Sequence, residues 1–188
     1  MKIIAITGLP LAGKGVITKK LEQRGFKFFL MRTAIEDKMA EAGLEVNNQT
    51  LREFPTELRE KNGRGIVAEL SIPYLEKMKT EETVVIDGIR SPEEIDVFKQ
   101  QYGDDFILIS VWASLKTRFS RLGNRLDHPK DEPTNLEELK WRDEKELGWG
   151  LAESIVKADY MIINEGTLEE YEAKIEAVLL KPTISSQL

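Results

Sequence analysis

The chain has 188 residues, a length that fits one compact domain or one domain with a small mobile insertion. It contains no cysteine and a single histidine, which excludes disulfides, thiolate zinc sites, thiol nucleophiles and histidine-rich metal sites. A formal net charge of −6 argues against nucleic-acid or membrane partners, and no apolar run approaches the ~20 residues that span a bilayer, so we expect a cytoplasmic protein.

Apolar runs rich in β-branched residues predict buried strands at Lys2–Thr7, Phe26–Met31, Thr83–Asp87, Phe106–Trp112 and Tyr160–Ile163. Helical patterns lie between them, at Gly13–Arg24, Ala34–Ala42, Asn48–Lys61, Gly65–Lys79, Pro92–Gln101, Ser114–Leu122, Leu136–Leu147 and Thr167–Leu180. Near-continuous apolar strands that alternate with helices predict an α/β fold, with a five-stranded, mostly parallel sheet covered on both faces. We expect one domain over residues 1–181 and a disordered tail over 182–188.

The first predicted strand runs into a glycine-rich turn followed by a helix, and the spacing of this turn is that of a Walker A motif. The turn and its first helical residues are Gly8, Leu9, Pro10, Leu11, Ala12, Gly13, Lys14, Gly15 and Val16. Such a turn directs backbone N–H groups at phosphates, the helix N-terminus adds positive potential, and Lys14 reaches the β- and γ-phosphates. We therefore predict that residues 8–16 bind ATP. The alternative is a glycine-rich turn with an incidental lysine.

The position after the lysine lacks the usual magnesium-binding hydroxyl. Serine or threonine normally follows the lysine, whereas this chain has Gly15 and then Val16. We therefore expect Mg²⁺ to be held through water and by a carboxylate elsewhere. Thr18 lies one turn further along and is interpreted as a residue of the helix face.

That carboxylate is predicted to be Asp87, at the end of an apolar strand in a Walker B pattern. Asp87 would orient magnesium-bound water, accept a proton from an acceptor hydroxyl, or do both. The alternative is an ordinary aspartate where a strand meets a turn. Arg90 follows closely, either as a phosphate clamp, which we favour, or as a partner of Glu93 or Glu94.

Arg118, Arg121 and Arg125 recur at spacings of three and four, which places them on one face of a predicted helix. They adjoin the polar, proline-containing loop at residues 123–134, and Arg142 lies on the helix that leaves this loop. A loop of this kind is often a mobile lid, and guanidinium groups suit phosphoryl oxygens. We predict a lid at about residues 118–142 that brings these four arginines over the transferred group. The alternative is a solvated helix face paired with acidic residues of the loop.

With these motifs in place, the chain resembles the nucleotide-kinase group of P-loop proteins. It is similar to adenylate kinases and dephospho-CoA kinases, and above all to an archaeal-type family of adenylate-kinase-related proteins. The resemblance extends to about Leu180, and its most specific segments lie at residues 8–15, 84–91, 117–119, 142–143 and 158–167. It implies a three-layer P-loop NTPase fold with a small lid insertion.

The resemblance also implies how the two substrates are bound. By analogy with dephospho-CoA kinases, Asn164, Gly166 and Thr167 would border the adenine of ATP, and Gly166 would allow close backbone approach. A turn that caps the last helix is the alternative, and both can hold. The acceptor would bind between the second strand and the helices at about residues 32–79.

The acceptor side departs from the pattern of these relatives. Adenylate kinases carry an arginine after the second strand and dephospho-CoA kinases an aspartate, whereas Thr33 and Glu36 align near those positions here. Arg32 is adjacent and would supply the missing charge. Arg59 is the next candidate, unless it pairs with nearby glutamates. Arg32, Arg59 and Arg90 are thus the predicted acceptor-binding residues.

The sequence predicts an ATP- and Mg²⁺-dependent kinase that acts on a small molecule, either a nucleotide or a compound like dephospho-CoA. The competing hypothesis is a switch protein that binds and slowly hydrolyses ATP and acts through protein partners. The pattern leaves open a hydroxyl or a phosphate acceptor, ATP or GTP as donor, and the oligomeric state.

Overall fold

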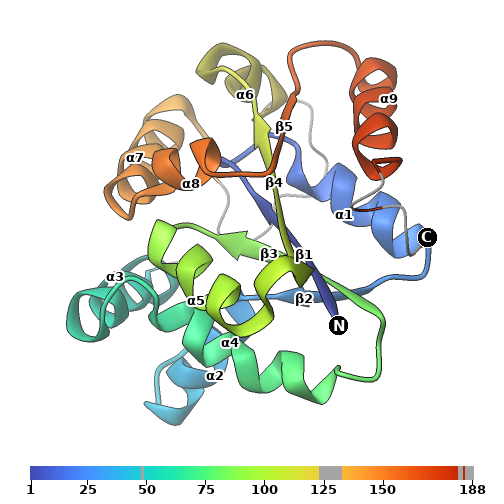
Figure 1. Cartoon of the computed structure of the whole chain (residues 1–188). Coiled ribbons are helices and arrows are strands. Elements are labelled where there is room, and N and C mark those ends of the chain that lie inside the picture. The colour runs from blue at the N-terminus through green and yellow to red at the C-terminus, as the bar shows by residue number, and fades with distance from the viewer. Residues whose placement is uncertain (48, 123–132, 182–183, 185–188) are drawn as a thin grey trace.

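The computed structural model describes residues 1–47, 49–122, 133–181 and 184 (Figure 1). In chain order its elements are β1 (Lys2–Thr7), α1 (Lys14–Gln23), β2 (Lys27–Leu30), α2 (Arg32–Glu41), α3 (Thr50–Asn62), α4 (Ile66–Lys77), β3 (Thr83–Ile89), α5 (Pro92–Tyr102), η1 (Gly103–Asp105), β4 (Phe106–Trp112), α6 (Leu115–Leu122), α7 (Leu136–Gly148), α8 (Leu151–Val156), β5 (Tyr160–Ile163) and α9 (Leu168–Leu179).

The five strands form one sheet in the order β2-β3-β1-β4-β5, and every neighbouring pair is parallel. Successive side chains of a strand point to opposite faces. Ile3 and Ala5 therefore join the core under α2, α4 and α5, while Ile4 and Ile6 join the core under α1 and α9 (Figure 1). Both faces are covered, so the predicted three-layer α/β fold is confirmed.

The topology brings the carboxyl ends of all five strands to one edge of the sheet. The chain adds β2 and β3 on one side of the central β1, and β4 and β5 on the other. In open α/β sheets the crevice beside such a reversal of direction is where ligands bind. The glycine-rich turn after β1 and Asp87 near the end of β3 both lie at this edge.

Several local expectations were incomplete. Helix α8, six residues long, was not predicted, because so short a segment shows too little periodicity. Strand β3 continues past Asp87 to Ile89, and its pairing with β1 shifts register there. Gly88 (φ +123°) lies at this shift.

The start of the last helix is capped as the alternative interpretation of that segment expected. Thr167 forms a full capping box with Glu170. At the C-terminal end, Ile184 is 2% exposed and packs in the core with Ile175, so the expected disorder fails at that residue. The other residues of the predicted tail lie outside the described residues. In the described part of the chain, no helix is long and apolar enough to cross a membrane.

Candidate active site

The turn after β1 approaches two other segments so closely that only glycine fits at two of its positions. Gly8 has φ +145°, and a Cβ on it would lie 2.3 Å from the carbonyl oxygen of Val111 at the end of β4. Gly13 has φ +111°, and a Cβ there would lie 2.3 Å from Nδ2 of Asn164. Both residues combine positive φ with a close approach, of the β4 backbone at Gly8 and of the Asn164 side chain at Gly13, which is the combination that glycine permits.

Lys14 folds back over this turn. Its Nζ donates hydrogen bonds to the carbonyl oxygens of Gly8 (2.8 Å) and Leu9 (3.2 Å). Burial lowers the pKa of the Lys14 ammonium, an effect that the nearby Asp87 and Glu146 carboxylates oppose. The lysine is thus a partly buried cation held at the turn by backbone oxygens, which phosphate oxygens can replace.

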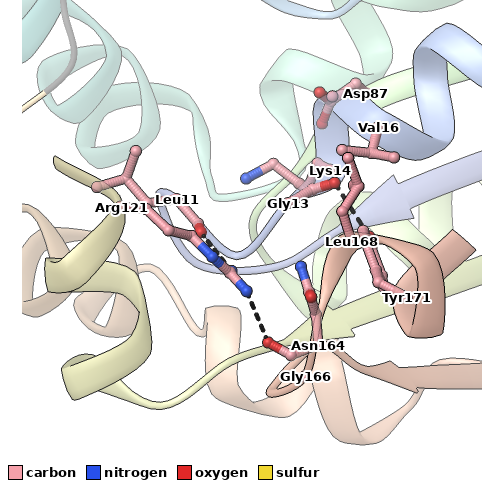
Figure 2. A pocket seen from close by; sticks show the side chains of 11 residues that line it. Leu11, Gly13, Lys14, Val16, Asp87, Arg121, Asn164, Gly166, Leu168 and Tyr171 are labelled. Atoms are coloured by element: carbon pink, nitrogen blue, oxygen red, sulfur yellow. Dashed lines mark hydrogen bonds between the residues drawn. The ribbon is translucent and has the colours of Figure 1, made fainter. Parts of the chain in front are cut away.

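Side chains from α6, from the segment after β5 and from α9 donate hydrogen bonds to the carbonyl groups of the turn (Figure 2). Arg121 of α6 donates to the carbonyls of Leu11 (3.0 Å), Ala12 (3.2 Å) and Asn164 (2.9 Å). The amide of Asn164 donates to Ala12 O at 2.8 Å, and the hydroxyl of Tyr171 donates to Gly13 O at 3.0 Å.

The hydrogen bonds to these carbonyl groups also fix the direction of the neighbouring N–H groups. In a trans peptide the C=O and the following N–H point in opposite directions. Because the carbonyls of Ala12 and Gly13 are held by Asn164 and Tyr171, the N–H groups of Gly13 and Lys14 are directed away from those side chains. The turn is preorganised to present N–H groups at the start of α1, as phosphate binding requires.

Arg118 does not lie where we predicted. It is 3% exposed, makes a bidentate ion pair with Asp143 of α7 (2.8 and 2.6 Å), and donates to the carbonyls of Ala113 and Pro10. It lines neither of the cavities described below. Arg118 therefore supports the turn through Pro10. It lies neither at the cavities, where we expected it to meet the transferred group, nor on a solvated helix face, which was the alternative.

A cavity of about 460 Å³ opens beside the turn. Its lining includes the predicted cofactor-binding residues Leu11, Gly13, Lys14, Gly15, Val16, Asn164 and Gly166, together with Asp87, Arg121, Leu168 and Tyr171 (Figure 2). Thr167 does not line the cavity, and its side chain caps α9 instead. Leu168 and Tyr171 were missed, because nothing in the first turns of an ordinary capped helix marks residues that face a ligand.

A second cavity, of about 330 Å³, lies on the other side of Lys14, among β2, β3 and the helices α2, α3, α4 and α7. The predicted acceptor-binding residues Arg32, Arg59 and Arg90 all line it, and so does Arg142. Residues far apart in the sequence are thus brought to one cavity. The two cavities have Leu11, Lys14 and Asp87 in common.

Asp87 stands where the two cavities meet, and one of its oxygens has no partner. Its Oδ1 is buried and accepts no hydrogen bond from the described residues. Burial raises the pKa of this carboxyl above its ordinary value, although the Lys14 and Arg90 cations act in the opposite direction. A buried acceptor without a donor is a place where a ligand group or an ordered water binds.

Such a carboxylate suits a magnesium ion that accompanies ATP. Mg²⁺ is usually held by one or two carboxylates plus water and substrate phosphates. The described residues contain no cluster of three or more acidic, histidine or cysteine side chains that could form a complete metal site. Thr18 donates its hydroxyl to Lys14 O at 3.3 Å, as expected for a residue of the helix face. Asp87 with its free Oδ1 therefore fits the predicted water-mediated role.

The arginines around the second cavity are paired with acids that local spacing did not identify. Arg59, 4% exposed, donates to Glu94 at 2.8 Å and lies over the ring of Trp149, 4.5 Å from its centroid. On α3 it donates to the carbonyl of Pro55 at 3.2 Å, and its acidic partner is thus Glu94 of α5 rather than the nearby glutamates that we considered. Arg32 donates to Glu36 at 2.7 Å, four residues further along α2.

Glu146 was missed by sequence reasoning and lies at the centre of this charge arrangement. It is 0% exposed, lines the second cavity, and binds both Arg90 and Arg142, the latter at 3.0 Å. Burial raises its pKa, but Arg90, Arg142 and Lys14 outweigh that effect and hold it below the ordinary value. The side chain of Arg90 thus pairs with Glu146, while the backbone N–H of Arg90 donates to Glu94 at 2.6 Å. The i, i+4 spacing of Arg142 and Glu146 was the one signal in the sequence.

The remaining predicted residues divide between the described and undescribed parts of the chain. Arg121 and Arg142 line the first and second cavity respectively. Arg125 and most of the predicted lid loop lie outside the described residues, so the four arginines expected over one group are not seen together.

Comparison with known proteins identifies related sequences over most of the chain. A family described as "AAA domain" matches residues 4–142. The chain is 35% identical over 181 residues to a "UPF0200 protein" of Thermococcus onnurineus, covering 95% of this chain and 97% of that one. It is 37% identical over 182 residues to a "UPF0200/UPF0201 protein" of Archaeoglobus fulgidus, where the match covers 96% of this chain and spans only 56% of the relative's length.

Solved structures share the fold at low sequence identity. TT1252 from Thermus thermophilus superposes with a TM-score of 0.63 at 21% identity, over 95% of this chain and 96% of that chain. A dephospho-CoA kinase from Campylobacter jejuni gives 0.60 at 14%, over 98% of each chain. A shikimate kinase from Bacteroides thetaiotaomicron gives 0.58 at 18%, over 95% and 96%. These likenesses establish a P-loop kinase-like fold.

Proposed function

Because the chain belongs to the UPF0200 family and has a P-loop kinase-like fold, we propose that it is an ATP-dependent phosphotransferase. It transfers the γ-phosphoryl group of ATP to a small-molecule acceptor. The solved kinases of this fold act on different acceptors. The fold therefore supports phosphoryl transfer as the reaction, and the identity of the acceptor has to be inferred from the residues of the site.

The observation that carries this proposal is the junction of the two cavities at Lys14, Leu11 and Asp87. The first cavity adjoins the turn that presents N–H groups to phosphates, and the second has arginines and an apolar wall. An enzyme that transfers a group between two bound molecules needs two sites that meet where the group passes. A cation and a carboxylate stand at that meeting point.

The residues take roles that follow from their positions. ATP lies in the first cavity with its phosphates on residues 8–15, and Lys14 leaves the carbonyls of Gly8 and Leu9 to bind the β- and γ-phosphates. Arg90 and Arg142 face the acceptor side, where their charge stabilises the transferred group. Mg²⁺, when bound with ATP, neutralises phosphate charge, and Asp87 holds its water ligands.

The test measures ADP formation from Mg²⁺·ATP with a panel of nucleosides, nucleoside monophosphates, dephospho-CoA and simple sugars. We expect one class of acceptor to raise ADP formation well above the ATPase background. Lys14→Ala should abolish both nucleotide binding and turnover, because it removes the partly buried cation at the turn. Lys19→Ala is the matched control, since Lys19 is an exposed residue of the same helix.

Undiminished turnover in Lys14→Ala would contradict the assignment of the phosphate site. If no acceptor stimulates ADP formation while ATP is still bound and slowly hydrolysed, the kinase proposal fails. The nucleotide-dependent switch then becomes the better description.

A further inference from the structure

Leu11, in the glycine-rich turn after β1, has a backbone conformation that leucine rarely adopts. Its φ is +62°, and among the described residues no other position apart from glycines has a positive φ. Glycine adopts left-handed conformations freely, whereas the Cβ of any other residue then lies too close to the following carbonyl oxygen. The backbone at position 11 therefore favours glycine, yet the chain carries a leucine there.

Hydrogen bonds on both sides of Leu11 hold this strained conformation. Arg118 donates to the carbonyl of Pro10 at 3.2 Å. Arg121 donates to the carbonyls of Leu11 (3.0 Å) and Ala12 (3.2 Å). Strained residues persist where the surrounding structure fixes them in this way, and they are concentrated at functional sites. These bonds reach only backbone atoms of the turn, so they would hold a glycine at position 11 equally well.

The side chain of Leu11 is not part of the hydrophobic core. Leu11 belongs to neither of the two core clusters that the described residues form, and it is only partly buried. Core packing therefore does not explain why this position carries a side chain.

The position of Leu11 at the two cavities provides an explanation. Leu11 lines both of them, as do Lys14 and Asp87, and it is the apolar member of this set (Figure 2). Leu51 and Pro55 of α3 are further apolar residues that line the second cavity. When ATP binds as proposed, its γ-phosphate lies where the two cavities meet, and Leu11 provides an apolar surface there.

We infer that Leu11 is a specificity-determining residue whose side chain keeps water away from the γ-phosphate of bound ATP, so that transfer to the acceptor is favoured over hydrolysis. This inference rests on the proposed phosphotransferase function and adds to it the residue that limits the competing reaction. Active sites that exclude water suppress side reactions such as hydrolysis.

The competing reaction takes place at the same phosphorus atom. A water oxygen forms a bond to the γ-phosphorus, the bond from that phosphorus to the β,γ-bridging oxygen breaks, and its electron pair leaves with ADP. One water proton is released, and the products are ADP, inorganic phosphate and a proton. A leucine side chain offers this water no hydrogen bond, whereas in the space left by a glycine the water has Lys14 and Asp87 as polar neighbours.

Leu11→Gly removes the side chain and relieves the backbone strain at the same time. Hydrolysis of Mg²⁺·ATP by the full-length protein is measured without acceptor, as release of inorganic phosphate. We expect kcat for hydrolysis to rise about tenfold, which corresponds to about 1.4 kcal/mol in the barrier, with the Kd for ATP unchanged. Tm should stay within about 3 °C of the wild type, because relief of the strain offsets the greater freedom of glycine in the unfolded chain.

Three further variants separate the side chain from the strain. Leu11→Ala keeps the strain but removes most of the side chain, so it should raise hydrolysis as Leu11→Gly does and have a lower Tm than that variant. Leu11→Met restores an apolar side chain of similar size and should hydrolyse ATP at the wild-type rate. Leu44→Ala is the matched control and should change nothing, since Leu44 is 40% exposed and lines neither cavity.

The outcomes for this inference and for the proposed function can be told apart. With an acceptor identified on the wild type, the fraction of consumed ATP that is recovered as phosphorylated acceptor should fall in Leu11→Gly and Leu11→Ala. Unchanged hydrolysis in both variants would overturn the inference and leave the phosphotransferase proposal intact. Loss of ATP binding or a large fall in Tm in Leu11→Gly would assign the side chain a structural role and overturn it too. If no acceptor stimulates ADP formation by the wild type, both proposals fail.

Discussion

Asp143→Asn removes the charge that neutralises Arg118 while keeping the shape of the side chain. Arg118 is 3% exposed and Asp143 8%, and two hydrogen bonds of 2.8 and 2.6 Å join them between α6 and α7. The substitution leaves a buried guanidinium without a counter-ion. Breaking a buried pair from one side in this way costs about 3–5 kcal/mol of unfolding free energy.

The corresponding fall in melting temperature is large enough to measure easily. For a domain of this size, each kcal/mol lowers Tm by about 2–4 °C, so we expect a decrease of about 6–20 °C. ATP affinity should fall as well, since Arg118 also holds the carbonyl of Pro10 in the phosphate-binding turn. Chemical denaturation measures the free energy, and nucleotide titration measures the affinity.

Glu153→Gln provides the matched control. It breaks the exposed i, i+4 pair between Glu153 and Lys157 and should leave stability unchanged within error. Replacing both Arg118 and Asp143 with apolar residues should recover part of the loss, because no buried charge then remains unpaired. A cost below about 1 kcal/mol for Asp143→Asn, typical of exposed pairs, would refute the reasoning.

Two further predictions concern the turn and the proposed base. Gly8→Ala forces a Cβ to within 2.3 Å of the backbone oxygen of β4 at φ +145°, so it should lose ATP binding and about 1–3 kcal/mol of stability. Gly148→Ala in α7, whose Cβ would meet no atom within 4 Å, should bind ATP normally in the same titration, and equal behaviour of the two variants would contradict the close-approach argument. Burial raises the pKa of Asp87, so kcat/KM should rise with pH through a limb that lies above the range of an exposed aspartate. Asp87→Asn should remove this limb and lower the rate by about 10²–10⁴-fold, and a limb that persists in the variant would exclude Asp87 as the base.

Local patterns in the sequence were sufficient to locate the strands of the sheet and the glycine-rich turn after β1. The five strands were located within a few residues, because buried parallel strands are continuous apolar runs between helices. Gly8, Gly13 and Lys14 were identified because their spacing and their position between a strand and a helix are set by phosphate geometry. Thr167 was identified as a cap because the bonds of a capping box join residues only three apart.

The partners of the charged side chains were decided by tertiary structure. Arg118 and Asp143 are 25 residues apart, and Arg59 and Glu94 are 35 apart. A helical pattern indicates which face an arginine occupies, but it does not say which acid the packing of another helix brings to that face.

The amino-acid sequence by itself therefore determined the fold, the glycine-rich turn after β1 and the set of arginines. Only the tertiary structure placed Glu146 between Arg90 and Arg142 at the second cavity. The physical reason is that a phosphate-binding turn is built from consecutive backbone groups. The charge of a cavity, in contrast, is the sum over side chains from elements that meet only after the chain has folded.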